Sequence, residues 1–414
     1  MAGFQAARGA LVCDGVPLAD IAREAGTPLH VYSAPLIADR YRAFDRAFAP
    51  ARHRLHYAIK ANSTLAIVRL LASLGAAADA NSGGELDVAL RAGVAPADIV
   101  FTGVGKTRAE LERAIAAGVA AINAESPGEM ARIADIAAAL GRTAPVAERI
   151  NPDVEAGSHP HISTGHRATK FGMSPADAAA MVRQMARRPG LRVVGLHVHV
   201  GSQITTPEPI ARAVRAIVAL ACQLAAEGIA VEHLDVGGGL GVPYDPAQHV
   251  MSLETYAREI LAATAGSGLT LRLEPGRWIV APSGVLLTEV VDLKRHPDGG
   301  WFVVVDAGMT ELLRPALYGA YHHIEPVKPR DGVPIRAEIV GPVCETSDTL
   351  GRDRALPPVQ VGDLLAIRDT GAYGAVMASN YNRRPTAAEV LVTPEGWSTV
   401  RRRQTVDEML QWDL

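Results

Sequence analysis

The chain has 414 residues, which leaves room for two or three domains and a large hydrophobic core. Hydrophobic residues make up 48% of the chain and charged residues 21%, the ordinary proportions of a soluble globular enzyme. The formal net charge of -3 excludes both the strongly basic surface of a nucleic-acid-binding protein and a strongly acidic tail.

Cysteine usage and the lack of targeting patterns predict a cytoplasmic protein. Cys13, Cys222 and Cys344 are far apart and odd in number, which fits a reducing compartment better than a disulfide framework. The first residues, MAGFQAARGALVCDG, lack the basic stretch and apolar run of a signal peptide. No window approaches 18 unbroken apolar residues, so we expect no membrane-spanning helix.

The first predicted elements are a strand and turn in residues 1–32, leading into LHVYS. From about residue 55 to residue 276, short apolar runs alternate with Ala- and Leu-rich stretches of helical period, such as 63–74 and 207–226. The apolar runs give eight candidate strands: HYAIK (56–60), AAADA (76–80), IVFTG (99–103), AAIN (120–123), VAERIN (146–151), VVGLHVHV (193–200), HLDVGG (233–238) and LRLEP (271–275). Eight strand-helix units predict a closed (β/α)8 barrel rather than an open sheet.

The tail changes character from about Gly284. Its apolar segments are VLLTEVVDLKR, WFVVVDAG, RAEIVGP, DLLAIRD and EVLV, separated by Pro, Gly and Asp. This pattern predicts a separate antiparallel β-domain.

Polar residues follow the predicted barrel strands, where the chemistry of this architecture is normally found. They are Lys60, Asp79, Asn123, Arg149, His199, Gly237–Gly239 and Glu274. Since strand ends in a barrel face one pocket, we expect these side chains to converge, and packing alone does not require so much polarity there.

Two of these positions favour a phosphate-bearing carbonyl cofactor, although each has a simpler interpretation. Lys60, in YAIKAN, suits Schiff-base chemistry as a buried amine, whereas an isolated lysine usually extends to the rim. The run Gly237–Gly239 follows the seventh strand, where backbone N–H groups of such barrels bind phosphate, but it also fits a tight turn.

Glu274 and His199 extend the same hypothesis. A carboxylate at Glu274 would keep a pyridine nitrogen protonated, or would form a salt bridge to Arg277 or Arg149. His197 and His199 share one face of a strand, but no further ligand has suitable spacing for a metal. We therefore expect His199 to stack on an aromatic cofactor, with Ser202 donating to its phosphate, and His197 to be a core residue.

Eleven ordered motifs resemble one known family. They are YAIKAN (57–62), NSGGEL (81–86), FTGVGKT (101–107), RINPD (149–153), HPHISTGHRATKFG (159–172), GLHVHVGSQI (195–204), LDVGGGLG (234–241), EPGR (274–277), DAGMTELLRPALYGAYHHI (306–324), GPVCETSD (341–348) and GAYGAVMASNYNRRP (371–385). The chain resembles the fold-type III pyridoxal-phosphate decarboxylases, specifically the diaminopimelate decarboxylases, with ornithine and arginine decarboxylases as more distant relatives. The resemblance implies an alanine-racemase-like barrel that binds pyridoxal 5'-phosphate.

The resemblance also implies roles for individual residues. Lys60 would bind the cofactor covalently, with Asp79 behind it and His199 stacked on the ring. The remaining cofactor-binding residues would be Ser202, Gly237, Gly238, Gly239, Glu274 and Tyr373. The distal end of the substrate would be bound by Arg277, Arg314, Tyr318, Glu345 and Tyr373. Cys344 would reprotonate Cα and, like Glu345, would come from the neighbouring subunit of a homodimer.

Two arginines and a tyrosine suit a substrate with a second carboxylate, whereas a diamine-type substrate would need acids. The resemblance therefore implies that meso-2,6-diaminopimelate is decarboxylated to L-lysine, the last step of lysine biosynthesis. A related decarboxylase acting on another amino acid, a carboxylated polyamine or a siderophore precursor is the alternative, as is a non-catalytic regulatory homologue. Trp278, where a small residue is expected, could reshape the pocket, and Asn81 is expected to serve local packing.

The resemblance also predicts how the chain divides into domains. The barrel would comprise residues 33–276, and a β-domain that completes the active site would combine residues 1–32 with 277–414.

Overall fold

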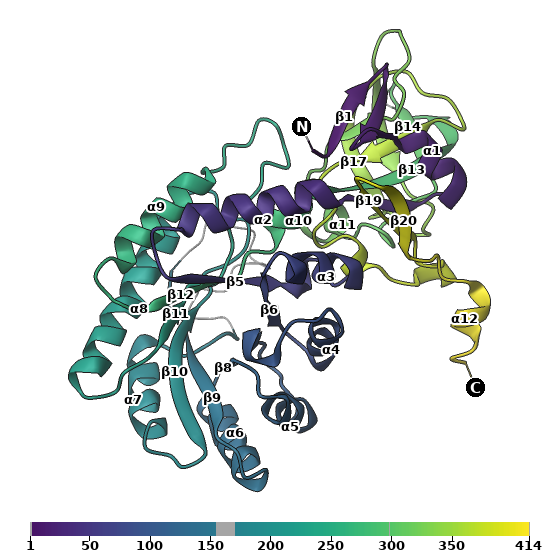
Figure 1. The fold of residues 1–414 in the computed structure, drawn as a ribbon. Helices are drawn as coiled ribbons and strands as arrows, with labels where there is room; N and C mark the ends of the chain where they lie inside the picture. Colours follow the sequence, from purple (N-terminus) through teal and green to yellow (C-terminus); the bar gives the residue numbers. More distant parts are fainter. Residues whose placement is uncertain (1, 155–169, 298, 414) are drawn as a thin grey trace. The chain divides into compact units, whose positions relative to one another are not determined.

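The computed structural model describes residues 2–154, 170–297 and 299–413. The chain forms two compact units (Figure 1). One is made of Tyr41–Val242 and His249–Trp278, and the other of Met1–Arg40, Pro243–Gln248 and Ile279–Leu414. This division differs from the predicted boundaries by the first turns of α2 (Ala34–Phe48), by residues 243–248 and by residues 277–278.

The first unit contains a closed barrel of eight parallel strands, as predicted. The strands are β5 (His53–Ala58), β6 (Ala77–Ala80), β7 (Ile99–Phe101), β8 (Ala121–Ala124), β9 (Ala144–Ile150), β10 (Leu191–Val198), β11 (His233–Asp235) and β12 (Thr270–Leu273). Strand β12 pairs with β5 in parallel, which closes the ring. Most strand residues are buried, and β6, β7, β8 and β11 are buried on both faces, which explains why the sequence shows continuous apolar runs there.

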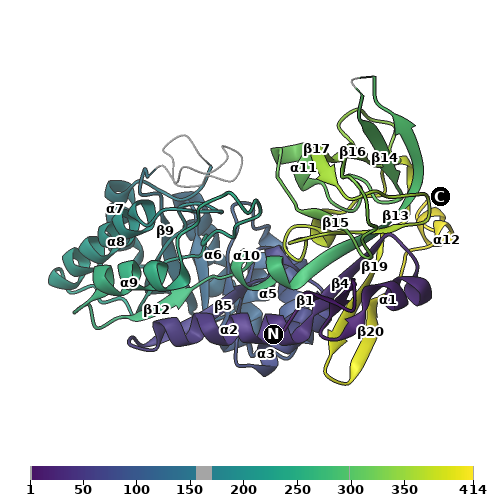
Figure 2. The same cartoon turned by 90° about the horizontal axis from the view of Figure 1, so that it is seen from above.

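Helices follow the strands and surround the barrel (Figures 1 and 2). They are α3 (Leu65–Ser73), α4 (Gly83–Arg91), α5 (Arg108–Ala117), α6 (Pro127–Ala139), α7 (Pro175–Met185), α8 (Glu208–Ala226), α9 (Leu253–Thr264) and the short α10 (Arg277–Val280). Five begin at a hydroxyl side chain that accepts a hydrogen bond from the first turn: Ser82, Thr107, Ser126, Ser174 and Ser252.

Helix α8 is, among the described residues, the one helix long and apolar enough to cross a membrane by those two criteria alone. Half of its apolar window is buried, and it packs against α7, α9 and β10. The apolar residues of α8 are therefore explained by its packing against the barrel and the neighbouring helices.

The second unit is built on a nine-stranded sheet. Its strands are β4 (Leu29–Ser33), β13 (Gly284–Arg295), β14 (Trp301–Val305), β15 (Ile324–Pro326), β16 (Ile335–Val340), β17 (Thr349–Leu356), β18 (Leu364–Ile367), β19 (Ala388–Thr393) and β20 (Gly396–Arg401). Most neighbours are antiparallel, as predicted, but β14 pairs with β16 and β4 with β19 in parallel. The N-terminal strand β4 lies between β13 and β19 and contributes to the same core.

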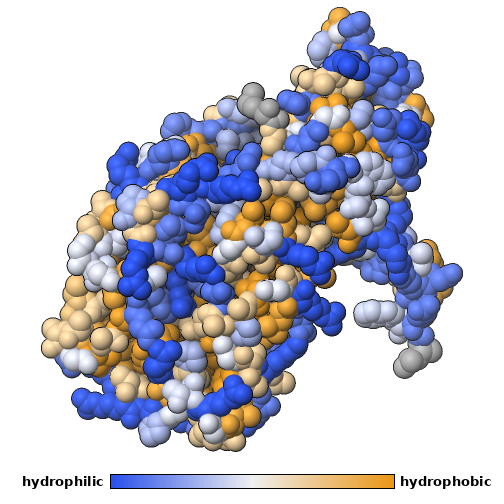
Figure 3. All heavy atoms as spheres, viewed as in Figure 1, coloured by the Kyte–Doolittle hydropathy of each residue, from blue (hydrophilic) through white to orange (hydrophobic). Residues whose placement is uncertain are grey.

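Smaller elements complete this unit. They are a three-stranded sheet of β1 (Phe4–Ala7), β2 (Ala10–Cys13) and β3 (Val16–Pro17), and the helices α1 (Leu18–Ala25), α11 (Arg314–Tyr318) and α12 (Val406–Leu410). Hydrophilic and apolar residues are interspersed on the molecular face drawn in Figure 3, in keeping with a net charge of -3.

Candidate active site

Lys60 and Asp79 meet where β5 and β6 end. Lys60 lies in a short 3-10 turn directly after β5, and its side chain is 33% exposed. Its Nζ donates to Asp79 Oδ2 at 3.3 Å, and the Asp79 side chain is fully buried. The structure thus brings the amine of Lys60 and the buried carboxylate of Asp79 together at the barrel end.

Asn81 is a second partner of Asp79, although the sequence suggested only a packing role. Its Nδ2 donates to Asp79 Oδ2 at 3.0 Å, and its backbone N–H donates to Glu85 Oε2 at 2.7 Å. Burial and the nearby charge of Glu274 raise the pKa of Asp79, against the opposing effect of Lys60. Burial also raises the pKa of Glu85, to about 7.

Glu274, at the end of β12, forms an ion pair with His197 of β10. His197 Nε2 lies 3.4 Å from Glu274 Oε1, and both side chains are buried. Burial acts to raise the pKa of Glu274, but the positive charges of His197 and Lys60 outweigh it and hold that pKa well below its usual range. The glutamate is therefore ionised, with His197 as its partner, while Arg149 pairs with Glu125 at 2.6 Å.

Asp235, at the end of β11, lies beside this pair and was not singled out from the sequence. His197, Asp235 and Glu274 each offer a ligand atom within 4.8 Å of the others, a geometry that could also hold a metal ion. Burial and the Glu274 charge raise the pKa of Asp235 to about 7. Its Oδ1 accepts a hydrogen bond from the N–H of Gly237 at 3.0 Å, which connects the cluster to the glycine run. The position of Asp235 at a strand end was the available signal.

His199 is a neutral imidazole. Its Nδ1 accepts a hydrogen bond from the N–H of Gly238 at 3.2 Å, which places the proton on Nε2. Burial and the neighbouring Lys60 lower its pKa well below the usual value. An uncharged flat ring is suited to stacking on an aromatic cofactor.

The three glycines are required where three strand-end loops meet. A Cβ on Gly237, Gly238 or Gly239 would lie 2.1–2.6 Å from backbone carbonyl oxygens, and φ is positive at Gly237 and Gly239. The N–H groups of Gly237 and Gly238 already donate within the protein. At the predicted phosphate site, these two residues therefore shape the loop, and their N–H groups are already used within the protein.

Ser202 and Arg277 are in direct contact. Arg277 donates to Ser202 Oγ from Nη2 at 2.8 Å and from Nε at 3.2 Å. Arg277, expected at the substrate, is thus held beside the residue expected at the phosphate. The following residue, Trp278, packs edge-on against Phe44 of α2 at 5.6 Å between ring centroids. The large indole ring of Trp278 therefore packs in a cluster of aromatic side chains around Phe44.

Asn123 and Arg149 belong to a separate buried network. Lys106 is only 6% exposed. Its Nζ donates to the carbonyl oxygens of Gly103 and Asn123 and to the carboxylate of Glu129. Arg149 is paired with Glu125. This network fixes the loop between β7 and α5, and Lys106 was not predicted because its partners Asn123 and Glu129 lie 17 and 23 residues away in the chain.

The other predicted residues belong to the second unit. Arg314 and Tyr318 lie on α11, Tyr373 has a φ of 57°, and Cys344 and Glu345 are exposed. The motif at 159–172 lies outside the described residues except for its last three positions.

Asp348 organises the loop that carries Cys344 and Glu345. Its Oδ1 accepts from the N–H of Met309 at 2.6 Å, and its Oδ2 from the N–H of Val343 at 2.7 Å. The two hydrogen bonds hold the start of this loop against a neighbouring segment of the chain.

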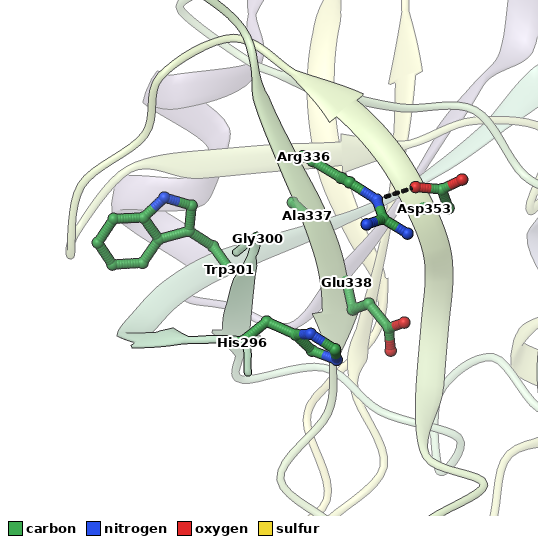
Figure 4. Close-up of a pocket in the computed structure, with 7 residues that line it drawn as sticks. All are labelled: His296, Gly300, Trp301, Arg336, Ala337, Glu338 and Asp353. Carbon is green, nitrogen blue, oxygen red and sulfur yellow. Dashed lines mark hydrogen bonds and ion pairs between the residues drawn. The ribbon is translucent and has the colours of Figure 1, made fainter. Parts of the chain in front are cut away.

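A small hollow on the sheet of the second unit contains none of the predicted site residues (Figure 4). It is lined by His296, Gly300, Trp301, Arg336, Ala337, Glu338 and Asp353. Its most polar members, Arg336 and Asp353, already pair with each other.

The barrel site has the donor set that pyridoxal 5'-phosphate needs. Asp79 Oδ1 is buried and accepts no hydrogen bond within the described part of the chain, and Glu274 Oε1 has the 3.4 Å ion pair with His197, so both carboxylates can receive a ligand's donor. Lys60 supplies an amine, and Ser202, held by Arg277, supplies a hydroxyl for a phosphate. These residues fit the cofactor.

Comparisons with known proteins show the family to which the chain belongs. Residues 35–281 match the model of the pyridoxal-dependent decarboxylase, pyridoxal binding domain. A diaminopimelate decarboxylase of Neisseria meningitidis serogroup A is 47% identical over 404 residues, covering 98% of this chain and 99% of the relative. One of Pseudomonas aeruginosa is 48% identical over 399 residues, covering 96% and 95%. The diaminopimelate decarboxylase of M. jannaschii, solved in co-complex with L-lysine, has a TM-score of 0.95 at 38% identity and covers 100% of this chain and 99% of its own.

Proposed function

Since the chain belongs to the family of pyridoxal-dependent decarboxylases, we propose that it converts meso-2,6-diaminopimelate to L-lysine and CO2. The observation that carries the proposal is the buried Glu274, held ionised beside His197 at the same barrel end as the Lys60–Asp79 pair. Full-length similarity to diaminopimelate decarboxylases supports this substrate.

The barrel residues would hold the cofactor. When bound, pyridoxal phosphate accepts the electron pair left at Cα as CO2 departs. Glu274 would accept a hydrogen bond from the protonated pyridine nitrogen and keep it protonated, and His199 would stack on the ring. Ser202 would donate to the phosphate beside the Gly237–Gly239 run, and Lys60 would bind the carbonyl carbon covalently.

The second unit would supply substrate contacts. Arg314, with Arg277 and Tyr318, would bind the distal carboxylate, because a guanidinium fork matches a carboxylate in two parallel hydrogen bonds. Glu345 would accept from the distal ammonium, and Tyr373 would contact both cofactor and substrate.

A homodimer with shared sites is part of the proposal. Cys344 and Glu345 are exposed, as residues acting in a neighbouring subunit must be, and Cys344 would return a proton to Cα. A two-fold interface would give two equivalent shared sites.

Mixing Lys60→Ala and Cys344→Ala proteins tests the shared site. Hybrid dimers would contain one site with both native residues. About half of randomly re-associated dimers are hybrids with one intact site in two, so activity should approach roughly a quarter of wild type. If labelled subunits exchange and activity stays at the level of the single variants, the shared site is wrong.

A cytoplasmic location and a functional division into residues 33–276 and the remainder are further parts of the proposal. The three cysteines form no disulfide, which supports a reducing compartment.

A substrate panel tests the function itself. Purified protein loaded with pyridoxal phosphate should release CO2 from meso-diaminopimelate and leave lysine, ornithine and arginine unchanged. Turnover of ornithine or arginine instead would favour a different decarboxylase. No turnover by protein that has the absorbance of bound cofactor would favour a regulatory homologue.

A further inference from the structure

A second set of buried polar contacts surrounds Arg314, at the start of α11. Arg314 is 5% exposed and His322 is fully buried. Arg314 Nη1 lies 2.7 Å from His322 Nε2, and His322 Nδ1 lies 2.7 Å from the carbonyl oxygen of Arg368. A guanidinium only donates and a carbonyl only accepts, so Nε2 accepts and Nδ1 carries the proton. His322 is therefore a neutral imidazole in one defined tautomer.

Tyr244 holds the same guanidinium on its flat face. The Arg314 Cζ lies 4.1 Å from the centroid of the Tyr244 ring, within the range of a cation–π contact. The rings of Tyr244 and His322 meet edge to face at 5.0 Å. Tyr244 is 6% exposed, so the stack is shielded from water. His322 thus holds one edge of the Arg314 guanidinium by a hydrogen bond, and Tyr244 holds one of its faces.

We propose that His322 and Tyr244 are positioning residues that orient Arg314 for the distal carboxylate of the substrate and so restrict the enzyme to dicarboxylates. The inference rests on the proposed function, in which Arg314 binds that carboxylate. An arginine side chain loses considerable rotamer freedom when it is fixed, and a group already fixed in the free protein loses less on binding. Both rings are neutral, so they orient the guanidinium without cancelling the charge that attracts the carboxylate.

Two amide substitutions at position 322 separate the two hydrogen bonds. In His322→Gln the side-chain amide can occupy the place of Nε2 and accept from Arg314. In His322→Asn the shorter amide can occupy the place of Nδ1 and donate to Arg368, but it does not reach Arg314. The two variants have the same chemistry and differ in reach, so each is the matched control of the other.

Steady-state kinetics of the loaded enzyme with meso-diaminopimelate gives the main result. His322→Asn should raise KM about 10- to 100-fold, the effect of one hydrogen bond to a charged group, with kcat within about threefold. His322→Gln should keep KM within about threefold of wild type. The absorbance of bound cofactor should be the same in both variants, since His322 does not lie in the barrel unit.

Other outcomes would overturn the inference. An unchanged KM in His322→Asn, or an equal rise in both variants, would show that His322 does not act through Arg314. If His322→Asn does not fold, Tyr244→Leu and Tyr244→Phe replace the pair. The leucine variant, which lacks the aromatic face, should then show the higher KM, and equal KM values would refute the proposal. Wild-type enzyme that is inactive on meso-diaminopimelate would instead refute the proposed function.

Discussion

Removing the imidazole of His197 should leave Glu274 as a buried charge without its partner. The atoms are 3.4 Å apart, and two unit charges at that distance interact by about 5 kcal/mol at an effective dielectric constant of about 20. Breaking a buried pair by deleting one partner typically costs about 3–5 kcal/mol. We therefore expect His197→Leu to lower the free energy of unfolding of the cofactor-free protein by about 3–5 kcal/mol.

A double-mutant cycle in urea measures whether this cost depends on Glu274. In Glu274→Gln the carboxylate is already neutral, so adding His197→Leu should cost much less. The expected coupling free energy is about 2–3 kcal/mol. If the two substitutions are additive within about 0.5 kcal/mol, the pair does not hold Glu274 ionised and the reasoning fails.

Two further predictions concern residues that support the site. Glu85 has a folded pKa of about 7, above its unfolded value, so the unfolded chain loses its proton first and stability should fall as pH rises from about 4.5 to about 7. Glu85→Gln, whose amide oxygen can still accept from Asn81, should flatten that part of a plot of thermal midpoint against pH, and an unchanged slope would contradict the assignment. Asp348→Ala removes the acceptor of two backbone N–H groups, so we expect a loss of about 1–3 kcal/mol in urea unfolding and lower kcat without loss of bound cofactor. Full kcat in that variant would show that the loop does not depend on Asp348.

The barrel was predictable because its signal is local. Most residues of each parallel strand are buried, so the strand leaves a short apolar run, and the polar residue that follows it lies at the barrel end. Lys60, Asp79 and Glu274 were found in this way. The motifs added the residues of the second unit, for which the pattern alone gave no role.

Features that depend on distant parts of the chain could not be predicted. Strand β4 is placed between β13 and β19 by pairing across most of the sequence, including one parallel pair within a mostly antiparallel sheet. His197 looked like a core residue, because its partner Glu274 is distant in the chain. The glycine run was identified from sequence, but only the three-dimensional contacts show that two of its N–H groups are already used.

The most direct test of the account is to locate the covalently bound cofactor. Holoenzyme reduced with borohydride, digested and analysed by mass spectrometry should carry the phosphopyridoxyl group on Lys60, the lysine paired with Asp79 at 3.3 Å. Lys60→Ala should lose both the adduct and decarboxylation. Lys106 is the internal control, since it is buried and bound to Glu129. An adduct on Lys106 or on any other lysine would contradict the account.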